Sequence, residues 1–374
     1  MKRQAGKKVY LKPEQLRIAV FSDAFHYRNG VGAYYCDLLK HLAPKIESAQ
    51  LICPEQDFQP GRFSFSIPMP GDRSQKLCLP GIKQTVRKIK ALRPHVIISA
   101  TPGPYGILGL IMARSTGTDF CFGYHTRYDQ LTDLYWNRVA GAVSSFVLKG
   151  LDRFFMRRAR LVFTNGKDMV SLAKASGAAR VRLIGTPLDP LLLVPPVQIK
   201  DEDAGPVLFV GRLAPEKNIQ LIIDAATELP GIYFIIAGTG PLSKYVQEAA
   251  DRLPNLEYVG WVDRNSLTSI LDHRCRILVL PSKMESFGTV AVEAMARERM
   301  VIVSDKCGIV DWPELTPGLE VIKAGSGLVP KIREISALPA EERQRRRKKA
   351  RKCCLSFVHR TITDWEQALA GDSI

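Results

Sequence analysis

The feature that most constrains the fold of this chain is an alternation of short apolar runs with amphipathic stretches. In the first half, the amphipathic stretch AYYCDLLKHLAP (33–44) follows the first apolar run. The apolar runs are RIAVFSD (17–23), QLICP (50–54), HVIISA (95–100), FCFGYH (120–125) and LVFTN (161–165). Alternation of this kind predicts a parallel sheet that is covered by helices on both faces.

The alternation stops at residues 185–206, GTPLDPLLLVPPVQIKDEDAGP, a stretch rich in proline and polar residues that is typical of a linker. It then restarts, with apolar runs at 206–212, 233–238, 256–261, 276–282 and 300–305. The 374 residues suffice for two domains. We therefore predict an α/β protein with two doubly wound, Rossmann-like domains that face each other across a cleft. Ligands of such sheets bind at the carboxyl ends of the strands.

The expected boundaries follow from these patterns. They are an N-terminal domain at 1–188, a linker at 189–205, a C-terminal domain at 206–340 and a basic C-terminal helix at 341–374 that packs back toward the N-terminal domain.

Composition narrows the class of partner. The chain has 53 Lys and Arg against 37 Asp and Glu, a net charge of +16, which favours an anionic partner. The eight cysteines form no C-x-x-C pair, which indicates reduced thiols in a cytoplasmic protein. The N-terminus has no apolar signal region, and no uncharged run reaches the roughly 20 apolar residues of a membrane span. Any membrane contact is expected to be peripheral.

Two glycine-bearing loops follow strand-like runs in the second half. In GRLAPEKN, Gly211 would admit a close ligand, while Arg212 and Lys217 suit a diphosphate. Gly238 follows the next run, in AGTGP. A solvated loop is the alternative for the two cations, and simple turn chemistry is the alternative for Gly238 and for Gly30 in the first half.

The segment ESFGTVAVEAMA (285–296) holds two carboxylates around a predicted helix start. If the helix begins near Gly288, its free N–H groups and positive dipole end suit an anion. Glu285 would then contact the group that bears the anion, and Glu293 would accept hydrogen bonds from two hydroxyls, as a ribose offers. The alternative is an acid in the first helical turn and a solvent-facing Glu293, although the neighbours of Glu293 are apolar.

These motifs, together with LEYVGWV, VSDKCG and the E-x7-E spacing, resemble the retaining family 4 glycosyltransferases, which have the GT-B fold. The resemblance covers nearly the whole chain. ATPGPYGILGLIMAR (100–114) and GYHTRYDQLTDLYW (123–136) are similar to the subgroup that glycosylates lipids such as diacylglycerol or phosphatidylinositol.

The resemblance implies specific roles for the matching residues. The residues expected in catalysis are Arg212, Lys217, Glu285 and His125. The residues expected to bind the donor are Gly30, Gly211, Gly238, Val262, Leu267, Phe287, Gly288, Thr289 and Glu293. His125 would line the sugar pocket, although a core histidine is the alternative. The donor is expected to be a UDP-sugar or GDP-sugar, with no metal and no other cofactor. The chain departs from the family at Cys307-Gly308, where many members have two glycines, and this leaves the identity of the donor open.

The same resemblance implies transfer with retention of the anomeric configuration to a membrane lipid. Basic segments at 82–93, 148–160 and 343–352 would hold the protein on an anionic surface, on the inner face of the cytoplasmic membrane. Solvated or sheet-packed helix faces are the alternative for these segments. A soluble sugar or cell-envelope oligosaccharide is the alternative acceptor. A non-catalytic nucleic-acid-binding protein is a remote alternative, because no nucleic-acid-binding motif is present.

Overall fold

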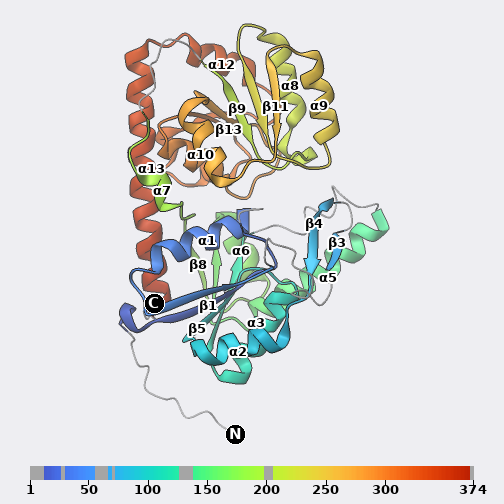
Figure 1. The fold of residues 1–374 in the computed structure, drawn as a ribbon, viewed down its shortest axis with the longest axis vertical. Helices are drawn as coiled ribbons and strands as arrows, with labels where there is room; N and C mark the ends of the chain where they lie inside the picture. Colours follow the sequence, from blue (N-terminus) through green and yellow to red (C-terminus); the bar gives the residue numbers. More distant parts are fainter. Residues whose placement is uncertain are drawn as a thin grey trace.

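The computed structural model describes residues 12–26, 30–54, 66–69, 72–125, 138–197 and 205–370. At 66–69, 72–76 and 138–145 it describes the backbone alone. Two lobes lie along the long axis of the molecule, and one long helix runs beside both (Figure 1). The motif at 123–136 and the linker residues 198–204 lie largely or wholly outside the described residues.

The N-terminal lobe contains a six-stranded sheet with the order β2-β1-β5-β6-β7-β8. All its pairs are parallel. The strands are β1 (Arg17–Phe21), β2 (Ser48–Ile52), β5 (Val96–Ser99), β6 (Asp119–Tyr124), β7 (Leu161–Thr164) and β8 (Val181–Leu183). A separate antiparallel pair is formed by β3 (Ser66–Met69) and β4 (Asp72–Cys78). The described helices of this lobe are α1 (Gly30–Leu42), α2 (Ile82–Leu92), α3 (Pro104–Thr116), α5 (Arg138–Met156) and α6 (Lys167–Ala175).

The C-terminal lobe repeats the plan with the strand order β11-β10-β9-β12-β13-β14, again parallel throughout. The strands are β9 (Val207–Val210), β10 (Phe234–Ala237), β11 (Leu256–Gly260), β12 (Ile277–Leu280), β13 (Met300–Ser304) and β14 (Glu320–Ile322). The helices are α8 (Ile219–Glu228), α9 (Ser243–Arg252), α10 (Arg264–His273), α11 (Thr289–Ala296) and α12 (Leu328–Ser336). The short helix α7 (Pro190–Leu193) lies in the linker, and α13 (Ala340–Ala370) ends the described chain.

Strand β1 is apolar at successive positions because both of its faces are buried. Ile18 and Val20 belong to one apolar cluster, whereas Ala19 and Phe21 belong to another. Alternate residues of a strand face opposite sides of the sheet, and all four are fully buried because helices cover both sides. The predicted fold class, two doubly wound parallel sheets, is confirmed.

The last turns of α13 dock on the N-terminal sheet through Trp365, which is fully buried. Its ring lies 4.1 Å from that of Phe163, centroid to centroid, and its Nε1 donates a 3.0 Å hydrogen bond to the Tyr34 hydroxyl. That hydroxyl donates in turn to the Gly185 carbonyl at 2.9 Å. Higher on α13, Phe357 stacks on Phe287 of the C-terminal domain with centroids 5.8 Å apart. One helix therefore packs into the cores of both domains.

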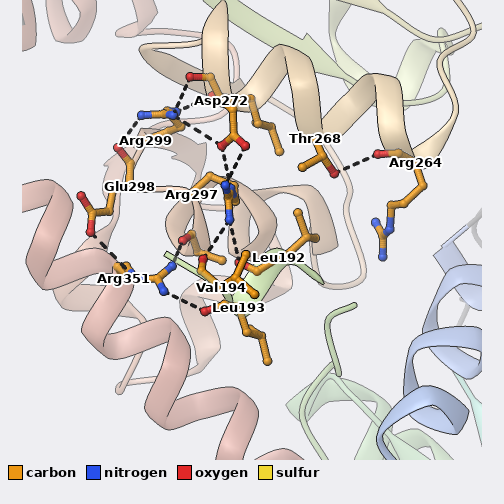
Figure 2. Close-up of polar contacts among 12 residues, drawn as sticks. Leu192, Leu193, Val194, Arg264, Thr268, Asp272, Arg297, Glu298, Arg299 and Arg351 are labelled. Atoms are coloured by element: carbon orange, nitrogen blue, oxygen red, sulfur yellow. Dashed lines mark hydrogen bonds and ion pairs between the residues drawn. The ribbon is translucent and has the colours of Figure 1, made fainter. Parts of the chain in front are cut away.

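The linker helix α7 is fastened to the C-terminal domain by two arginines (Figure 2). Arg297 pairs with Asp272 through two 2.6 Å contacts and donates to the Val194 carbonyl at 2.9 Å. Arg351 of α13 donates to the Leu193 carbonyl at 2.7 Å. Charged donors that end on backbone carbonyls fix the path of the linker more firmly than apolar contact alone.

His125 lies in the N-terminal core at the end of β6. Its ring centroid is 4.4 Å from that of Tyr34, and its Nε2 is 3.0 Å from the Tyr35 hydroxyl. Burial lowers the pKa of His125 to about 4, and a hydrogen bond with Asn165 opposes this only in part. The imidazole is therefore neutral near pH 7.

Within the described residues, none of the helices combines the length and the apolar character that crossing a bilayer requires.

Replacing Trp365 by Ala is expected to lower the free energy of unfolding by about 3–5 kcal/mol, because it empties a fully buried ring site. Urea unfolding of the variant and the wild type gives the difference. Phe154→Ala is the control, since Phe154 is 39% exposed. An equal, small loss for both variants would contradict the docking role of Trp365.

The stability of the protein should depend on pH through His125. Its folded pKa, about 4, lies below the ordinary 6.5, so its contribution is present above pH 6.5 and is lost as the pH falls through 4. This loss approaches about 3 kcal/mol. We expect His125→Gln to unfold with a shallower loss of stability between pH 7 and 4, measured by urea titration at each pH. Parallel curves would show that the buried imidazole does not set this slope.

Candidate functional site

The loops that follow β9 and β10 are packed directly against each other. Gly238 has φ +131°, and a Cβ there would lie 1.8 Å from the carbonyl oxygen of Gly211. The Gly211 N–H donates to the Ala237 carbonyl at 3.1 Å. No other residue type fits at Gly238, so the two glycine-bearing turns predicted from the sequence form one continuous surface at the carboxyl ends of the strands.

An ion pair joins the loop after β9 to the loop after β12. Lys217, the last residue of the 3₁₀ turn Pro215–Lys217, places its Nζ 2.5 Å from Oε2 of Glu285. Burial alone lowers the pKa of Lys217, but Glu285 outweighs it and the net pKa is raised. Both side chains are more than four-fifths buried, so the ammonium stays charged in a largely water-excluded place.

Arg212 lies on the same loop after β9 as Lys217. Its guanidinium NH1 is 3.9 Å from Oε1 of Glu216, which is itself buried. The Glu216 carbonyl accepts from the Lys283 N–H at 2.8 Å, so the same loop is tied by backbone to the segment that precedes Glu285. The structure therefore joins Lys217 directly to Glu285 and places Arg212 on the loop that carries Lys217.

Helix α11 begins next to Glu285 and has no side-chain cap. Its N-cap residue is Gly288, and Thr289 is the first helical residue. Helix α3 differs, because Asp23 accepts from the Tyr105 N–H at 2.9 Å and so occupies the amino end of that helix with the protein's own carboxylate. The first N–H groups of α11 remain available for an external anion.

The loop around Cys307 and Gly308 runs beside Ser286 and Phe287. A Cβ at Gly308 would lie 2.0 Å from the Ser286 carbonyl oxygen, so this glycine permits the close approach of the two loops. The Cys307 thiol is buried, lies 3.5 Å from the Leu280 carbonyl, and has its pKa raised to about 11 by burial. The Cys307 thiol is therefore buried in the core of the domain, near enough to Lys217 and Glu285 for both charges to act on its pKa. Phe287 is also a core residue, buried against Phe357.

Glu293 lies inside α11 and is 3% exposed, which excludes the solvent-facing alternative. One of its oxygens, Oε1, accepts from NH1 of Arg264. Arg264 also contacts Asp37 of α1, in the other domain. The second acid of the E-x7-E motif therefore lies at the junction of the two domains, close to residues of both.

The remaining predicted donor residues lie in different surroundings. Val262 is half-buried on the turn between β11 and α10, and Leu267 packs into the core from α10. Gly30 begins α1, and a Cβ there would meet no atom within 4 Å among the described residues. His125 lies in the aromatic core described above, as expected for the alternative in which it is a core histidine. A direct role for His125 in the site stays a prediction.

Sequence reasoning missed Arg264, Asp37 and Asp189. Asp189 has a local signal, since it precedes a proline and caps α7 by accepting from the Leu191 N–H at 3.0 Å. The sequence signal for Asp37 is weaker: it is an acid inside an otherwise apolar helix segment. No sequence signal marks Arg264, because it is one of many cations and its partners are distant in sequence.

The arrangement suits a ligand with a diphosphate flanked by hydroxyls. Arg212 and Lys217 lie on one loop, Lys217 is joined to the segment before the uncapped start of α11, and the acids Glu285 and Glu293 lie before and within that helix. Such fixed charges stabilise negative charge that develops on a leaving group. The expectation that no metal is needed stays a prediction.

Two family models match the chain. Residues 28–190 match Glycosyltransferase Family 4, and residues 195–353 match Glycosyl transferases group 1.

Individual proteins agree with these matches. The sulfoquinovosyl transferase SQD2 of Arabidopsis thaliana is 23% identical over 80% of this chain and 61% of its own length, so the chain spans about three-fifths of that relative. Sucrose-phosphate synthase of Thermosynechococcus elongatus has a similar fold, with a TM-score of 0.72, 16% identity and coverage of 95% of this chain and 98% of its own. HepE of Anabaena, solved in complex with UDP-glucose, also has a similar fold. Its TM-score is 0.66 and its identity is 17%, and the match covers 95% of this chain and 98% of HepE. The chain belongs to the GT-B glycosyltransferases, with a family 4 N-terminal domain and a group 1 C-terminal domain.

Proposed function

We propose that this protein is a retaining glycosyltransferase that moves a sugar from a UDP-sugar or GDP-sugar to a lipid at an anionic membrane surface. The observation that carries the proposal is the pair Lys217–Glu285, whose Nζ and Oε2 are 2.5 Å apart, beside the uncapped amino end of α11.

The donor fits this site group by group. The diphosphate lies between the Lys217 ammonium, the Arg212 guanidinium and the first N–H groups of α11. The ribose hydroxyls donate to Glu293, about one turn further along the helix. Glu285 accepts from hydroxyls of the sugar while it holds Lys217 in place.

The reaction follows from where these charges lie. The bond between the anomeric carbon and the diphosphate oxygen breaks, and the acceptor oxygen bonds to the same carbon on the same face. The acceptor's proton passes to the departing phosphate oxygen. The carboxylate of Glu285 is bound to Lys217, so it is not a free nucleophile of the kind that retaining hydrolases use. Catalysis then depends on stabilising the diphosphate.

Related proteins support the donor class. The solved HepE structure contains UDP-glucose and has the same fold as this chain, and the relative in Arabidopsis is named a sulfoquinovosyl transferase. These ligands and reactions belong to those proteins. They favour a nucleotide sugar as the donor here and leave UDP and GDP as the two candidates.

The surface of α5 supports a lipid acceptor. Phe146 is 80% exposed, Val147 is 51% exposed and Phe154 is 39% exposed. The exposed cations Lys149 and Arg153 lie on the same helix. Aromatic and cationic side chains on one helix are typical of a segment that lies in a membrane interface. In the view of Figure 1, helix α5 and the β3–β4 pair lie at the same side of the N-terminal lobe.

The two other basic segments differ from each other. On α2, Thr85, Ile89 and Leu92 are buried, whereas its four cations, Lys83, Arg87, Lys88 and Lys90, are exposed. That helix adds positive charge to the N-terminal lobe and packs beside α3. In 343–352, by contrast, most arginines are held internally: Arg346 contacts Glu320 at 2.7 Å and Arg351 contacts the Leu193 carbonyl. We therefore assign membrane contact to α5 and α2 and assign the C-terminal segment chiefly a structural role.

Lys217→Ala is expected to reduce kcat by about 10²–10³, because it removes one fixed donor to the leaving diphosphate. The measurement is release of nucleotide from UDP- and GDP-sugars in the presence of lipid acceptors. Lys244→Ala is the control, since that side chain is 91% exposed on α9. Turnover of Lys217→Ala at the wild-type rate would remove the basis of the proposal.

Phe146→Glu is expected to weaken binding to vesicles that contain anionic lipid by about tenfold or more, since burying a Phe side chain stabilises by 1.5–3 kcal/mol. Co-sedimentation at graded salt gives the affinity, which should also fall as salt rises. Val321→Glu, at a 41% exposed position on β14, is the control. Failure of the wild type to bind anionic vesicles at low salt would exclude the lipid surface and leave a soluble acceptor.

A further inference from the structure

Arg264, the first residue of α10, contacts carboxylates from both domains. Its NH1 donates to Oε1 of Glu293, and its NH2 donates to Oδ2 of Asp37 on α1. Its Nε is 3.8 Å from Oδ2 of Asp189, at the start of the linker helix. The guanidinium extends away from α10 toward α1 of the N-terminal domain (Figure 2).

Asp37, Lys40, Asp189, Arg264 and Glu293 form one charge cluster, in which the three carboxylates are shielded from water and the Lys40 side chain is 43% exposed. The side chain of Asp37 is 0% exposed, that of Asp189 is 1% exposed and that of Glu293 is 4% exposed. Lys40 joins through a 2.5 Å contact between its Nζ and Oδ2 of Asp189. Three buried carboxylates thus share two cations, and removal of Arg264 would leave buried negative charge without compensation.

The contact with Arg264 fixes the orientation of the Glu293 side chain. A carboxylate has about four acceptor sites, so the bond from NH1 leaves sites for two ligand hydroxyls. Arg264 and a ribose can therefore bind Glu293 at the same time.

The other contacts of Arg264 connect Glu293 to the N-terminal domain. Asp37 is on α1, and Asp189 caps the linker helix. Burial raises the pKa of Asp37 to about 7 even though Arg264 opposes this. The ionised state of Asp37, and with it the strength of this contact, therefore depends on the guanidinium remaining in place.

We propose that Arg264 is a positioning residue that couples nucleotide binding at Glu293 to the arrangement of the two domains. The proposal rests on the function proposed above, in which Glu293 receives the ribose. One end of the guanidinium orients the acid for the ribose, and the other holds α1 against the C-terminal domain. The coupling is reciprocal, so a nucleotide that binds Glu293 favours the domain arrangement in which Asp37 reaches Arg264.

A neighbouring buried arginine provides the contrast. Arg297 pairs with Asp272 through Nε and NH2, both at 2.6 Å, and holds the linker through carbonyls (Figure 2). It is 3% exposed, so it is at least as well buried as Arg264, but neither Asp272 nor the linker carbonyls are expected to touch the donor. Its loss should reduce stability without changing nucleotide affinity.

The test measures UDP and GDP affinity by titration calorimetry on the full chain, beside thermal unfolding of the same samples. The variants are Arg264→Met, Arg264→Lys and Asp37→Asn, with Arg297→Lys as the buried control and Arg274→Met as the surface control. Arg264→Met should weaken affinity about tenfold or more, since it removes a charge-assisted hydrogen bond that orients Glu293. Arg264→Lys should recover part of that loss. Asp37→Asn should weaken affinity severalfold, although Asp37 touches Arg264 and not the nucleotide.

Non-additivity separates coupling from a structural role. The double variant Asp37→Asn, Arg264→Met should bind nucleotide no more weakly than Arg264→Met alone, because Asp37 acts through the guanidinium. If Asp37→Asn and Arg264→Lys lose thermal stability but keep wild-type affinity, the coupling is wrong. If the wild type binds neither UDP nor GDP, the proposed function itself fails. If Arg264→Met does not fold, the nucleotide affinities of Asp37→Asn and Arg264→Lys test the coupling.

Discussion

The ion pair between Lys217 and Glu285 determines the layout of the candidate site, because it joins two loops whose residues are 68 positions apart in the chain. β9 and β12 are neighbours in the sheet, so their following loops emerge at one edge. Asn218 strengthens the junction by donating to the Pro281 carbonyl at 3.2 Å. With the loops joined, a buried ammonium lies beside the start of α11, whose free N–H groups carry no side-chain cap. One contact thus places two sources of positive potential together.

A second requirement is that two separately folded sheets keep a defined relation to each other. Helix α13 packs Phe357 in one core and Trp365 in the other, and Arg351 ties that helix to the linker. These apolar and backbone contacts hold the domains as neighbours. Arg264 differs from them because it ends on carboxyl groups near the site, one from each domain. Contacts of that kind respond to a ligand, whereas buried aromatic packing does not.

Much of the fold and part of the site could be predicted from the sequence, because they depend on local patterns. Buried parallel strands require continuous apolar runs, and the turn at Gly238 requires a residue without a Cβ. The contacts of Arg264 could not be predicted, since Asp37 is 227 positions away and only packing brings them together. The internal contacts of the basic segment 343–352 could not be predicted for the same reason. Its charge is visible in the sequence, but the partners that hold Arg346 and Arg351 belong to distant elements.

The most direct test of this account is a crystal structure of the protein with bound UDP or GDP. The account predicts the diphosphate at the amino end of α11 and within hydrogen-bonding distance of Lys217. It also predicts the ribose hydroxyls on Glu293, with Arg264 still bound to that acid. A nucleotide bound elsewhere, or a ribose that leaves Glu293 untouched, would contradict it.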